Sequence, residues 1–329
     1  MSPENKLCGW VPVEFLIESD EMSFHWMDFS GVNISEPFFR QTVAKMVERG
    51  NQKKASSMQD LIRIGSRTPP IPPSCLIFHV SRCGSTLLAN ALRASCNCIV
   101  LSEPKIITDL FHFCNDLPAP AQLLRDSILQ SIVNLYAGYQ GIQRNIIIKL
   151  ASWNLLSFRL FRKVWPDVPC ILLIRHPGEV IVSNLKPGGW LNFRSNPQCA
   201  SRLLELDEMQ VEQTSDMEFC ARVIKRLNET ALEFINARLM IIDYNMIDAG
   251  LMPAIAEFIG FNSAGLDWNA VKSTFQVYAK DQNGTRAFED DRVAKRSQAA
   301  QLITGSSADL ATESYNLLLQ RALNNFPSR

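Results

Sequence analysis

Residues 74–95, SCLIFHVSRCGSTLLANALRAS, constrain the fold more than any other stretch of this 329-residue chain. A fully apolar run is followed by a short polar segment, and apolar residues then recur with helical spacing from Ser85. A strand, a tight loop and a helix are expected in that order. Gly84 lets the loop backbone approach a ligand, and amide groups at a helix start point together at an anion. With Arg82, Ser85 and Thr86 as further donors, this loop predicts a phosphate-binding site; the alternative is a plain strand-to-helix turn with a capping serine.

Apolar runs and helical patterns continue to alternate along the chain after this loop. Short β-branched runs separated by helices predict a parallel sheet that is covered on both faces. We therefore expect a three-layer α/β fold of the phosphate-loop nucleotide-binding type. The further strands are expected within residues 98–101, 145–150, 169–177 and 238–244, and the further helices at 121–139, at 155–164, from 177 and across 201–237.

The N-terminal residues 1–72 predict a separate small α+β module. The stretch VEFLIESDEMSFHWMDF is consistent with two strands, and a helix is expected from Pro37 with Ser35 as its N-cap. The apolar stripe of this helix is expected to pack on the main domain. The proline-rich stretch at 68–73 prevents regular structure and marks a boundary, after which an α/β domain covers 73–329.

Composition narrows the possible partners and surroundings of the chain. Lys plus Arg and Asp plus Glu both number 33, so no global positive field favours nucleic acid or anionic membranes. Because the first twenty residues hold no apolar signal segment and no stretch resembles a membrane span, we expect a cytoplasmic protein. Nine scattered cysteines favour reduced thiols, and four histidines without i, i+4 pairing predict no metal site.

The predicted phosphate loop differs from two familiar anion-binding loops. Nucleotide triphosphatases carry G-x-x-x-x-G-K-[ST], whereas Ser85 follows Gly84 here and no lysine is placed to reach β and γ phosphates. Cysteine phosphatases need an arginine six residues after the cysteine, where Ala89 follows Cys83. A kinase or GTPase is therefore disfavoured, and Cys83 is interpreted as a small spacer.

Further polar residues follow the later apolar runs. Ligands of open α/β sheets bind beyond the carboxyl ends of the strands, so these positions are candidates for chemistry. Each also has a structural interpretation: an exposed strand-end charge, a helix-surface serine, a snorkelling lysine or a first-turn acid of the next helix. The four residues are Glu103, Lys149, Arg175 and Ser183.

Taken together, these positions resemble the PAPS-dependent sulfotransferases, in particular the tyrosylprotein sulfotransferase branch and its bacterial relatives. The resemblance rests on the basic residue, the glycine and the two hydroxyls of the first loop, and on an Arg-x-Pro strand end at Arg175 with Ser183 following it. The spacing of Glu103 after Arg82 matches that branch. So does the position of Lys149 on the strand that precedes the Arg-x-Pro strand.

The resemblance covers roughly residues 74–190 and implies a role for each matching residue. The donor is PAPS, 3′-phosphoadenosine 5′-phosphosulfate, and the acceptor is a hydroxyl of a metabolite, glycan or peptide, without a metal ion. Glu103 is the implied general base, with Arg82 and Lys149 as catalytic cations. Arg175 and Ser183 are the implied ligands of the 3′-phosphate. The implied 5′-phosphosulfate loop consists of Arg82, Cys83, Gly84, Ser85, Thr86 and Leu87.

Two alternative functions stay open at this point. One is a nucleotide or metabolite kinase of the wider phosphate-loop class, and the other is a non-catalytic protein that binds a nucleotide with the same fold. Lys280 and Arg286 lie in a charged loop that either closes over the donor or is a solvated surface loop. Trp190 either lines an acceptor pocket or packs in the interior.

Overall fold

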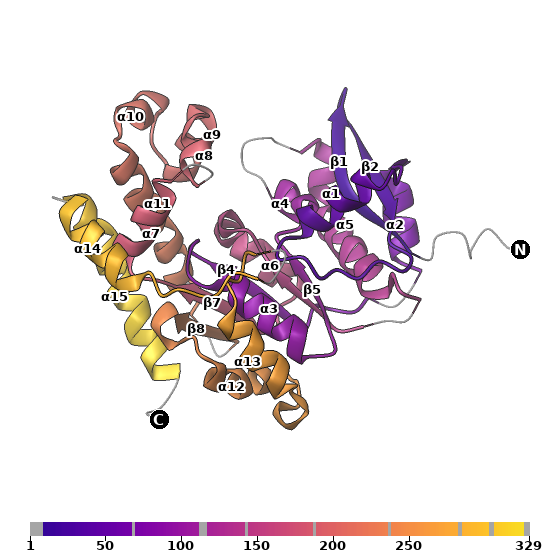
Figure 1. The fold of residues 1–329 in the computed structure, drawn as a ribbon. Helices are drawn as coiled ribbons and strands as arrows, with labels where there is room; N and C mark the ends of the chain where they lie inside the picture. The colour runs from indigo at the N-terminus through magenta and orange to yellow at the C-terminus, as the bar shows by residue number, and fades with distance from the viewer. Residues whose placement is uncertain are drawn as a thin grey trace, which may run out of the picture.

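A five-stranded parallel sheet forms the centre of the molecule, with the strand order β5-β6-β4-β7-β8 (Figure 1). The computed structural model describes residues 9–67, 70–111, 117–141, 144–186, 189–235, 238–281, 285–302 and 306–325. Helices lie on both faces of the sheet, so the expected α/β fold is confirmed. The strands are β4 (Cys75–His79), β5 (Ile99–Ser102), β6 (Ile146–Lys149), β7 (Cys170–Ile174) and β8 (Leu239–Asp243).

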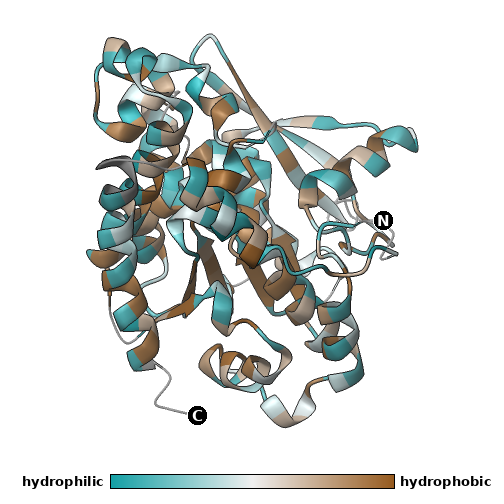
Figure 2. Ribbon diagram, turned by 60° about the vertical axis from the view of Figure 1, so that its left-hand side comes forward, coloured by the Kyte–Doolittle hydropathy of each residue, from teal (hydrophilic) through white to brown (hydrophobic). Residues whose placement is uncertain are grey.

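Burial on both faces explains the composition of these strands. Every residue of the five strands is buried, and Figure 2 shows hydrophobic colour along the strands of the sheet. A strand covered on both faces is apolar throughout instead of alternating. The last residue breaks this pattern in four strands, which end in buried His79, Ser102, Lys149 and Asp243. Polar groups therefore collect at the carboxyl edge of an otherwise apolar sheet.

The strand order opens a crevice above the central strand. The chain runs from β4 to the edge strand β5, returns to β6 beside β4, and then crosses to β7 on the other side of β4. In open α/β sheets, such a reversal leaves room for a ligand at the carboxyl ends of the strands. The loop at 80–84 lies there, between β4 and α3 (Ser85–Ser95).

The helices largely follow the predicted pattern, with local corrections. The helix expected at 155–164 is a 3₁₀ turn, η2 (Ser152–Ser157), followed by α6 (Phe158–Val164). Helices α12, α13, α14 and α15 come from a part of the sequence for which no helices were predicted. The remaining helices and turns after the first loop are α4 (Lys105–Leu110), α5 (Ala119–Gly138), α7 (Pro177–Asn184), α8 (Leu191–Arg194), α9 (Pro197–Leu204), α10 (Glu208–Gln213), α11 (Asp216–Leu232), η3 (Tyr244–Met246), η4 (Ala249–Leu251), α12 (Met252–Phe258), η5 (Ser263–Gly265), α13 (Trp268–Gln276), α14 (Arg292–Leu302) and α15 (Ser306–Asn325).

The N-terminal module contains a three-stranded antiparallel sheet in the order β1-β2-β3. The two predicted strands and the helix are present, but the helix begins at Phe39 and not at Pro37. Its N-cap is Phe38 and not Ser35, because the Phe38 amide donates to the Gln41 side chain at 3.0 Å and fixes the later start. The elements are β1 (Trp10–Glu18), β2 (Glu21–Asp28), α1 (Phe39–Glu48), β3 (Lys54–Ser57) and α2 (Met58–Gly65).

The module packs on the α/β domain through aromatic side chains. Phe39 of α1 stacks on Phe29 with ring centroids 5.7 Å apart and meets the edge of Tyr136 in α5 at 5.3 Å. The buried Tyr136 hydroxyl donates to the Pro12 carbonyl at 2.7 Å, which satisfies its polar group. One apolar core thus continues from the module into the α/β domain and includes Phe39 and Met46, as expected for the helix stripe, whereas Val47 of the predicted stripe is exposed. The division at residue 72 stays a prediction.

The structure bears on the expectations about thiols, membrane-spanning segments and metal sites. Cys199 is disulfide-bonded, so the expectation of reduced thiols is wrong at that residue. Among the described residues, six other cysteines are free thiols, and Cys96 is the one of these six that is not fully buried. Among the described residues, no helix has the length and apolarity needed to cross a membrane. The same ranges hold no cluster of three His, Cys, Asp or Glu side chains suited to a metal ion.

Candidate active site

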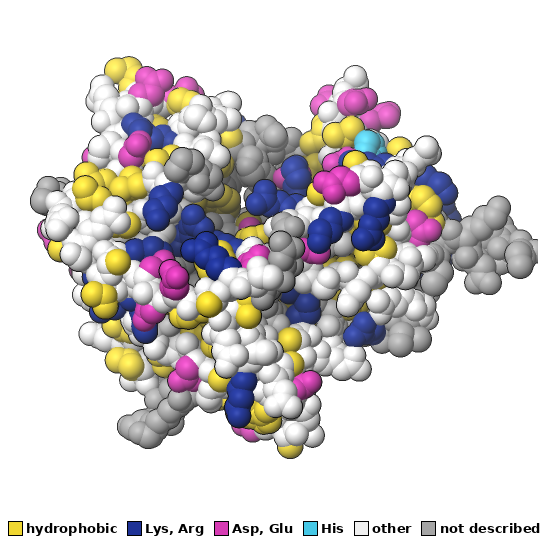
Figure 3. Space-filling view, viewed as in Figure 1, with side chains coloured by type: hydrophobic (Ala, Val, Ile, Leu, Met, Phe, Trp, Pro, Cys, Tyr) yellow, Lys and Arg dark blue, Asp and Glu magenta, His cyan; other side chains and the backbone are white. Residues whose placement is uncertain are grey.

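A cleft of about 870 Å³ lies above the carboxyl ends of the central strands. Figure 3 shows the molecule hollowed between the lobe of α8–α11 and the N-terminal strands, with Lys and Arg side chains gathered around the hollow. All the site residues predicted from the sequence line this one cleft. They are Arg82, Cys83, Gly84, Ser85, Thr86, Leu87, Glu103, Lys149, Arg175 and Ser183.

The first loop has a strained backbone that exposes amide groups to the cleft. Ser81 and Arg82 have positive φ angles of 68° and 52°, which are uncommon for residues with a side chain. Gly84 has φ 81° and is the N-cap of α3, so no side chain caps the first amides of this helix. A Cβ atom on Gly84 would lie 2.9 Å from both Ile247 and Tyr244. The loop therefore requires glycine here and presents uncapped helix amides, which suit an anion.

Cys83 has no nucleophilic role in this geometry. Its side chain is fully buried beneath the loop, and burial raises the pKa of the thiol to about 12. A thiol with that pKa stays protonated at neutral pH and is a poor nucleophile. The loop can use the backbone of Cys83 for anion binding, while its side chain packs in the core.

Lys149 connects the predicted base with the phosphate loop. Its Nζ lies 2.5 Å from Glu103 Oε1 and 3.4 Å from the Thr86 hydroxyl at the start of α3. The side chain is only 1% exposed, so it does not extend to the solvent as a snorkelling lysine would. A single buried ammonium thus contacts both a carboxylate and a hydroxyl at the start of α3.

Glu103 is held in the cleft by its backbone and by its ionic partners. Its φ angle is 52°, and it precedes Pro104, the N-cap of α4, so it is not an acid of the first helical turn. Burial favours the neutral carboxyl, but the Lys149 ammonium and the contact with His79 outweigh burial and hold the pKa of Glu103 well below its usual range. The group is therefore ionised at neutral pH and is a weak base while these contacts hold.

His79 is a site residue that sequence reasoning missed. It ends β4, and its Nδ1 accepts a hydrogen bond from the Ser81 amide at 3.0 Å. This contact leaves the proton of a neutral imidazole on Nε2, which lies 3.5 Å from Glu103 Oε1. Burial lowers the pKa of His79, in keeping with a neutral ring. Its only sequence signal is a polar residue at the end of an apolar strand, directly before the loop.

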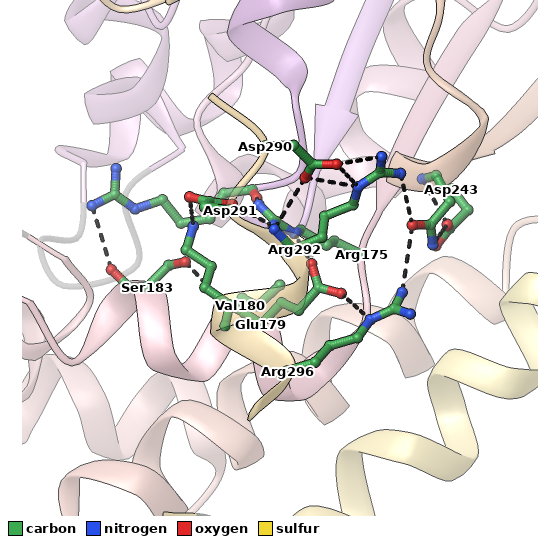
Figure 4. Close-up of polar contacts among 12 residues, drawn as sticks. Arg175, Glu179, Val180, Ser183, Asp243, Asp290, Asp291, Arg292 and Arg296 are labelled. Carbon is green, nitrogen blue, oxygen red and sulfur yellow. Dashed lines mark hydrogen bonds and ion pairs between the residues drawn. The ribbon is translucent and has the colours of Figure 1, made fainter. Parts of the chain in front are cut away.

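Arg175 is buried within a network of acidic partners (Figure 4). Its Nε donates to Glu179 Oε2 at 2.6 Å, and its Nη2 donates to Asp291 Oδ1 at 3.0 Å. The remaining nitrogen, Nη1, donates to the Arg82 carbonyl at 2.8 Å, and the guanidinium lies over the Tyr244 ring at 4.1 Å. Arg175 is therefore not an exposed strand-end charge, and it links β7 directly to the first loop.

Ser183 lines the same cleft as Arg175. Its hydroxyl donates to the Glu179 carbonyl one turn earlier in α7, at 2.7 Å. The Ser183 carbonyl accepts from Arg82 Nη2 at 3.4 Å. The serine is 3% exposed, so it is not a helix-surface residue, and its hydroxyl would have to rotate away from the helix to donate to a ligand.

The C-terminal loop and the N-terminal module add further residues to the cleft. Lys280, Arg286 and Trp190 all line it, as does Phe38, the residue that precedes α1. The Phe38 ring centroid lies 4.9 Å from Lys149 Nζ and 5.9 Å from Lys280 Nζ. Burial, together with neighbouring cations, lowers the pKa of Lys280 to about 8. Sequence reasoning left Lys280 and Arg286 out of the site, and it did not consider Phe38.

The fold and the site together define an α/β protein with a cleft at the carboxyl ends of its strands that is lined by Lys and Arg side chains and by the start of a helix. No family model matches the chain, and no curated protein matches it. Solved structures with a similar fold include the sulfotransferase domain from the curacin biosynthetic pathway, at 17% identity and a TM-score of 0.45, over 75% of this chain and 99% of that domain.

Two further sulfotransferases align with the chain at lower similarity. Mouse sulfotransferase SULT7A1 complexed with PAP is 12% identical with a TM-score of 0.40, over 83% of this chain and 93% of that one. A sulfotransferase from Alicyclobacillus acidocaldarius is 12% identical with a TM-score of 0.39, over 69% of this chain and 99% of that one. Because these identities and TM-scores are low, the proposed function is argued from the site residues alone.

Proposed function

We propose that this protein is a sulfotransferase that moves a sulfuryl group from PAPS to a hydroxyl acceptor, with Glu103 as the general base. The observation that carries the proposal is the position of Lys149, which contacts Glu103 at 2.5 Å and Thr86 at 3.4 Å. A cation between a base and an anion-binding loop suits the transfer of a charged group from that loop to an oxygen next to the base.

The cleft has two places that suit the phosphates of such a donor. The uncapped start of α3, with Arg82 beside it, would hold the 5′-phosphosulfate. Arg175 would hold the 3′-phosphate, because a planar guanidinium matches the oxygens of a phosphate. The hydrogen bond from Arg175 to the Arg82 carbonyl, at 2.8 Å, fixes the two places relative to each other.

The proposed reaction breaks one bond to sulfur and forms another. The sulfur–oxygen bond to the donor phosphate breaks, the acceptor oxygen bonds to sulfur, and the acceptor proton moves to Glu103. Negative charge shifts to the leaving phosphate and to the sulfuryl oxygens, where Arg82, Lys149 and the loop amides can stabilise it. Arg82 and the loop amides supply a charge and donors already in place, whereas Lys149 is first held by Glu103.

The ion pair of Lys149 and Glu103 must loosen for this reaction. While the ammonium contacts the carboxylate, it keeps the pKa of Glu103 low and makes the carboxylate a weak base. A sulfuryl group in the loop would attract Lys149 towards Thr86, which weakens its contact with Glu103. The carboxylate then becomes a stronger base when a donor is present, and this couples donor binding to proton removal.

The experiment that tests the proposal follows sulfur-radiolabelled PAPS incubated with the protein and separate pools of metabolites, glycans and peptides. We expect label in one pool with wild-type protein and almost none with Glu103→Gln. If the protein bound adenosine 3′,5′-bisphosphate but gave no labelled product in any pool, the non-catalytic alternative would be favoured. Magnesium-dependent turnover of ATP, with no transfer from PAPS, would favour a kinase.

A further inference from the structure

Asp291 is the one exposed acid in direct contact with Arg175 within the described residues. Its carboxylate accepts from Arg175 Nη2 at 3.0 Å and pairs with Lys295 Nζ at 2.5 Å. The other acidic partner, Glu179, is 1% exposed and is also held by Arg296 at 2.6 Å. The Asp291 side chain is 49% exposed and lies at the cleft, just before α14. If Glu179 lost Arg175, a buried carboxylate would lose an ionic partner, whereas Asp291 can leave Arg175 and be hydrated by solvent.

The geometry of this contact matches that of a ligand phosphate. Figure 4 shows Asp291 on the Arg175 guanidinium, with Glu179 on the side of α7. Nε donates to Glu179 and Nη1 to the Arg82 carbonyl, both from positions buried in the fold. The Nη2 hydrogen bond to Asp291 is the one that faces a cleft residue open to solvent. An incoming phosphate would therefore compete with Asp291 for the same guanidinium nitrogen.

We propose that Asp291 is an internal competitor that occupies the 3′-phosphate position on Arg175 and is displaced when the donor binds. The inference rests on the proposed function, because it takes Arg175 as the 3′-phosphate ligand. Donor binding then exchanges one charge-assisted hydrogen bond for another, so the net gain is smaller than with a free arginine. The same exchange would promote release of the bisphosphate product, since Asp291 returns to Arg175 as the phosphate leaves.

The test is a calorimetric titration of full-length variants with adenosine 3′,5′-bisphosphate and, separately, with AMP. Asp291→Asn keeps the shape of the side chain and removes its charge. We expect about three- to tenfold tighter binding of the bisphosphate, the range of an ion pair at a half-exposed site, and slower dissociation in stopped-flow measurements. AMP affinity should change by less than about twofold, because AMP brings no phosphate to Arg175.

Asp290→Asn is the matched control for this substitution. Asp290 is the preceding residue, is similarly exposed at 41%, and pairs with Arg292 at 2.5 Å instead of with Arg175. It should leave both affinities within about twofold of wild type. Unchanged bisphosphate affinity in Asp291→Asn would overturn the inference, and so would equal tightening in both variants, which would indicate a general effect of charge. If wild type and both variants bound AMP as tightly as the bisphosphate, the proposed function itself would fail, and the competitor role with it.

Discussion

Substitution of Glu103 by glutamine separates its proposed catalytic role from its structural role. The change keeps the size of the side chain but removes its charge and its ability to accept the acceptor proton. If Glu103 is the general base, the rate of sulfuryl transfer should fall by about 10²–10⁴-fold. The assay is transfer of label from PAPS into the acceptor pool that wild type uses, with kcat and KM measured separately.

The structure predicts two further effects of the same substitution. Lys149 is 1% exposed and would lose its counterion, so the free energy of unfolding should fall by about 1–3 kcal/mol. The freed ammonium would also attract anions more strongly, and bisphosphate affinity should rise by about three- to tenfold. Denaturant unfolding and calorimetric titration measure these two quantities.

The contribution of ionised Glu103 to the free energy of unfolding depends on pH. The folded-state pKa of Glu103 lies below its ordinary value of 4.5, so its ionic contribution is present at neutral pH. That contribution is lost as the pH falls below about 4.5 towards the folded-state pKa. The stability difference between wild type and Glu103→Gln should therefore shrink at acid pH.

A matched control and two contradictory outcomes complete the test. Asp109→Asn removes an acid that pairs with Lys105, a 68% exposed lysine one turn earlier in the same helix, α4. It should cost at most about 1 kcal/mol and leave both transfer and binding unchanged. A Glu103→Gln variant that is destabilised but transfers at nearly the wild-type rate would refute the base assignment. Unchanged bisphosphate affinity would show instead that Lys149 does not reach the anion site.

Other substitutions and conditions test separate parts of the cleft. Lys149→Met should reduce transfer by at least about 10²-fold and weaken bisphosphate binding, both measured as above; a normal transfer rate would exclude a catalytic role for the ammonium. Gly84→Ala should lower the free energy of unfolding by about 1–3 kcal/mol, seen in denaturant unfolding, because its φ is 81° and the new Cβ would meet Ile247 and Tyr244 at 2.9 Å. Bisphosphate affinity should decrease as the pH rises above about 8, because Lys280 has a pKa of about 8 and loses its charge there; Lys280→Gln should remove this step in pH-dependent titrations, and a persistent step would assign it to another group. Chelator should leave bisphosphate affinity unchanged, whereas a loss restored by magnesium would contradict a site built from protein cations.

The sequence predicted the parts of the fold that depend on local patterns. The five strands of the sheet are short and apolar up to their last residue, so their positions could be predicted from the local sequence pattern. Strand β3 (Lys54–Ser57) was missed, because its mostly exposed residues carry no apolar pattern and it is held by backbone pairing with β2. The helix α2 that follows it was missed within the same polar stretch. Strand order was not predicted, since it depends on pairings between distant segments.

The site was predictable where function places a polar residue directly after an apolar strand. Lys149 and Arg175 could be found in this way, and the structure brings both to one cleft with Glu103. Asp291 and Phe38 could not, because they lie in segments whose approach to the cleft depends on tertiary packing. Arg175 is paired with Glu179 and Asp291, and no local sequence pattern predicted the contact with Asp291.

The most direct test of the central claim is a titration of wild-type protein with adenosine 3′,5′-bisphosphate and with AMP, repeated with Arg175→Ala. A charge-assisted contact of the 3′-phosphate is worth about 1.5–3 kcal/mol, so wild type should bind the bisphosphate at least about tenfold more tightly than AMP. Arg175→Ala should remove this preference and leave AMP affinity nearly unchanged. Equal affinities of wild type for the two nucleotides would contradict the account.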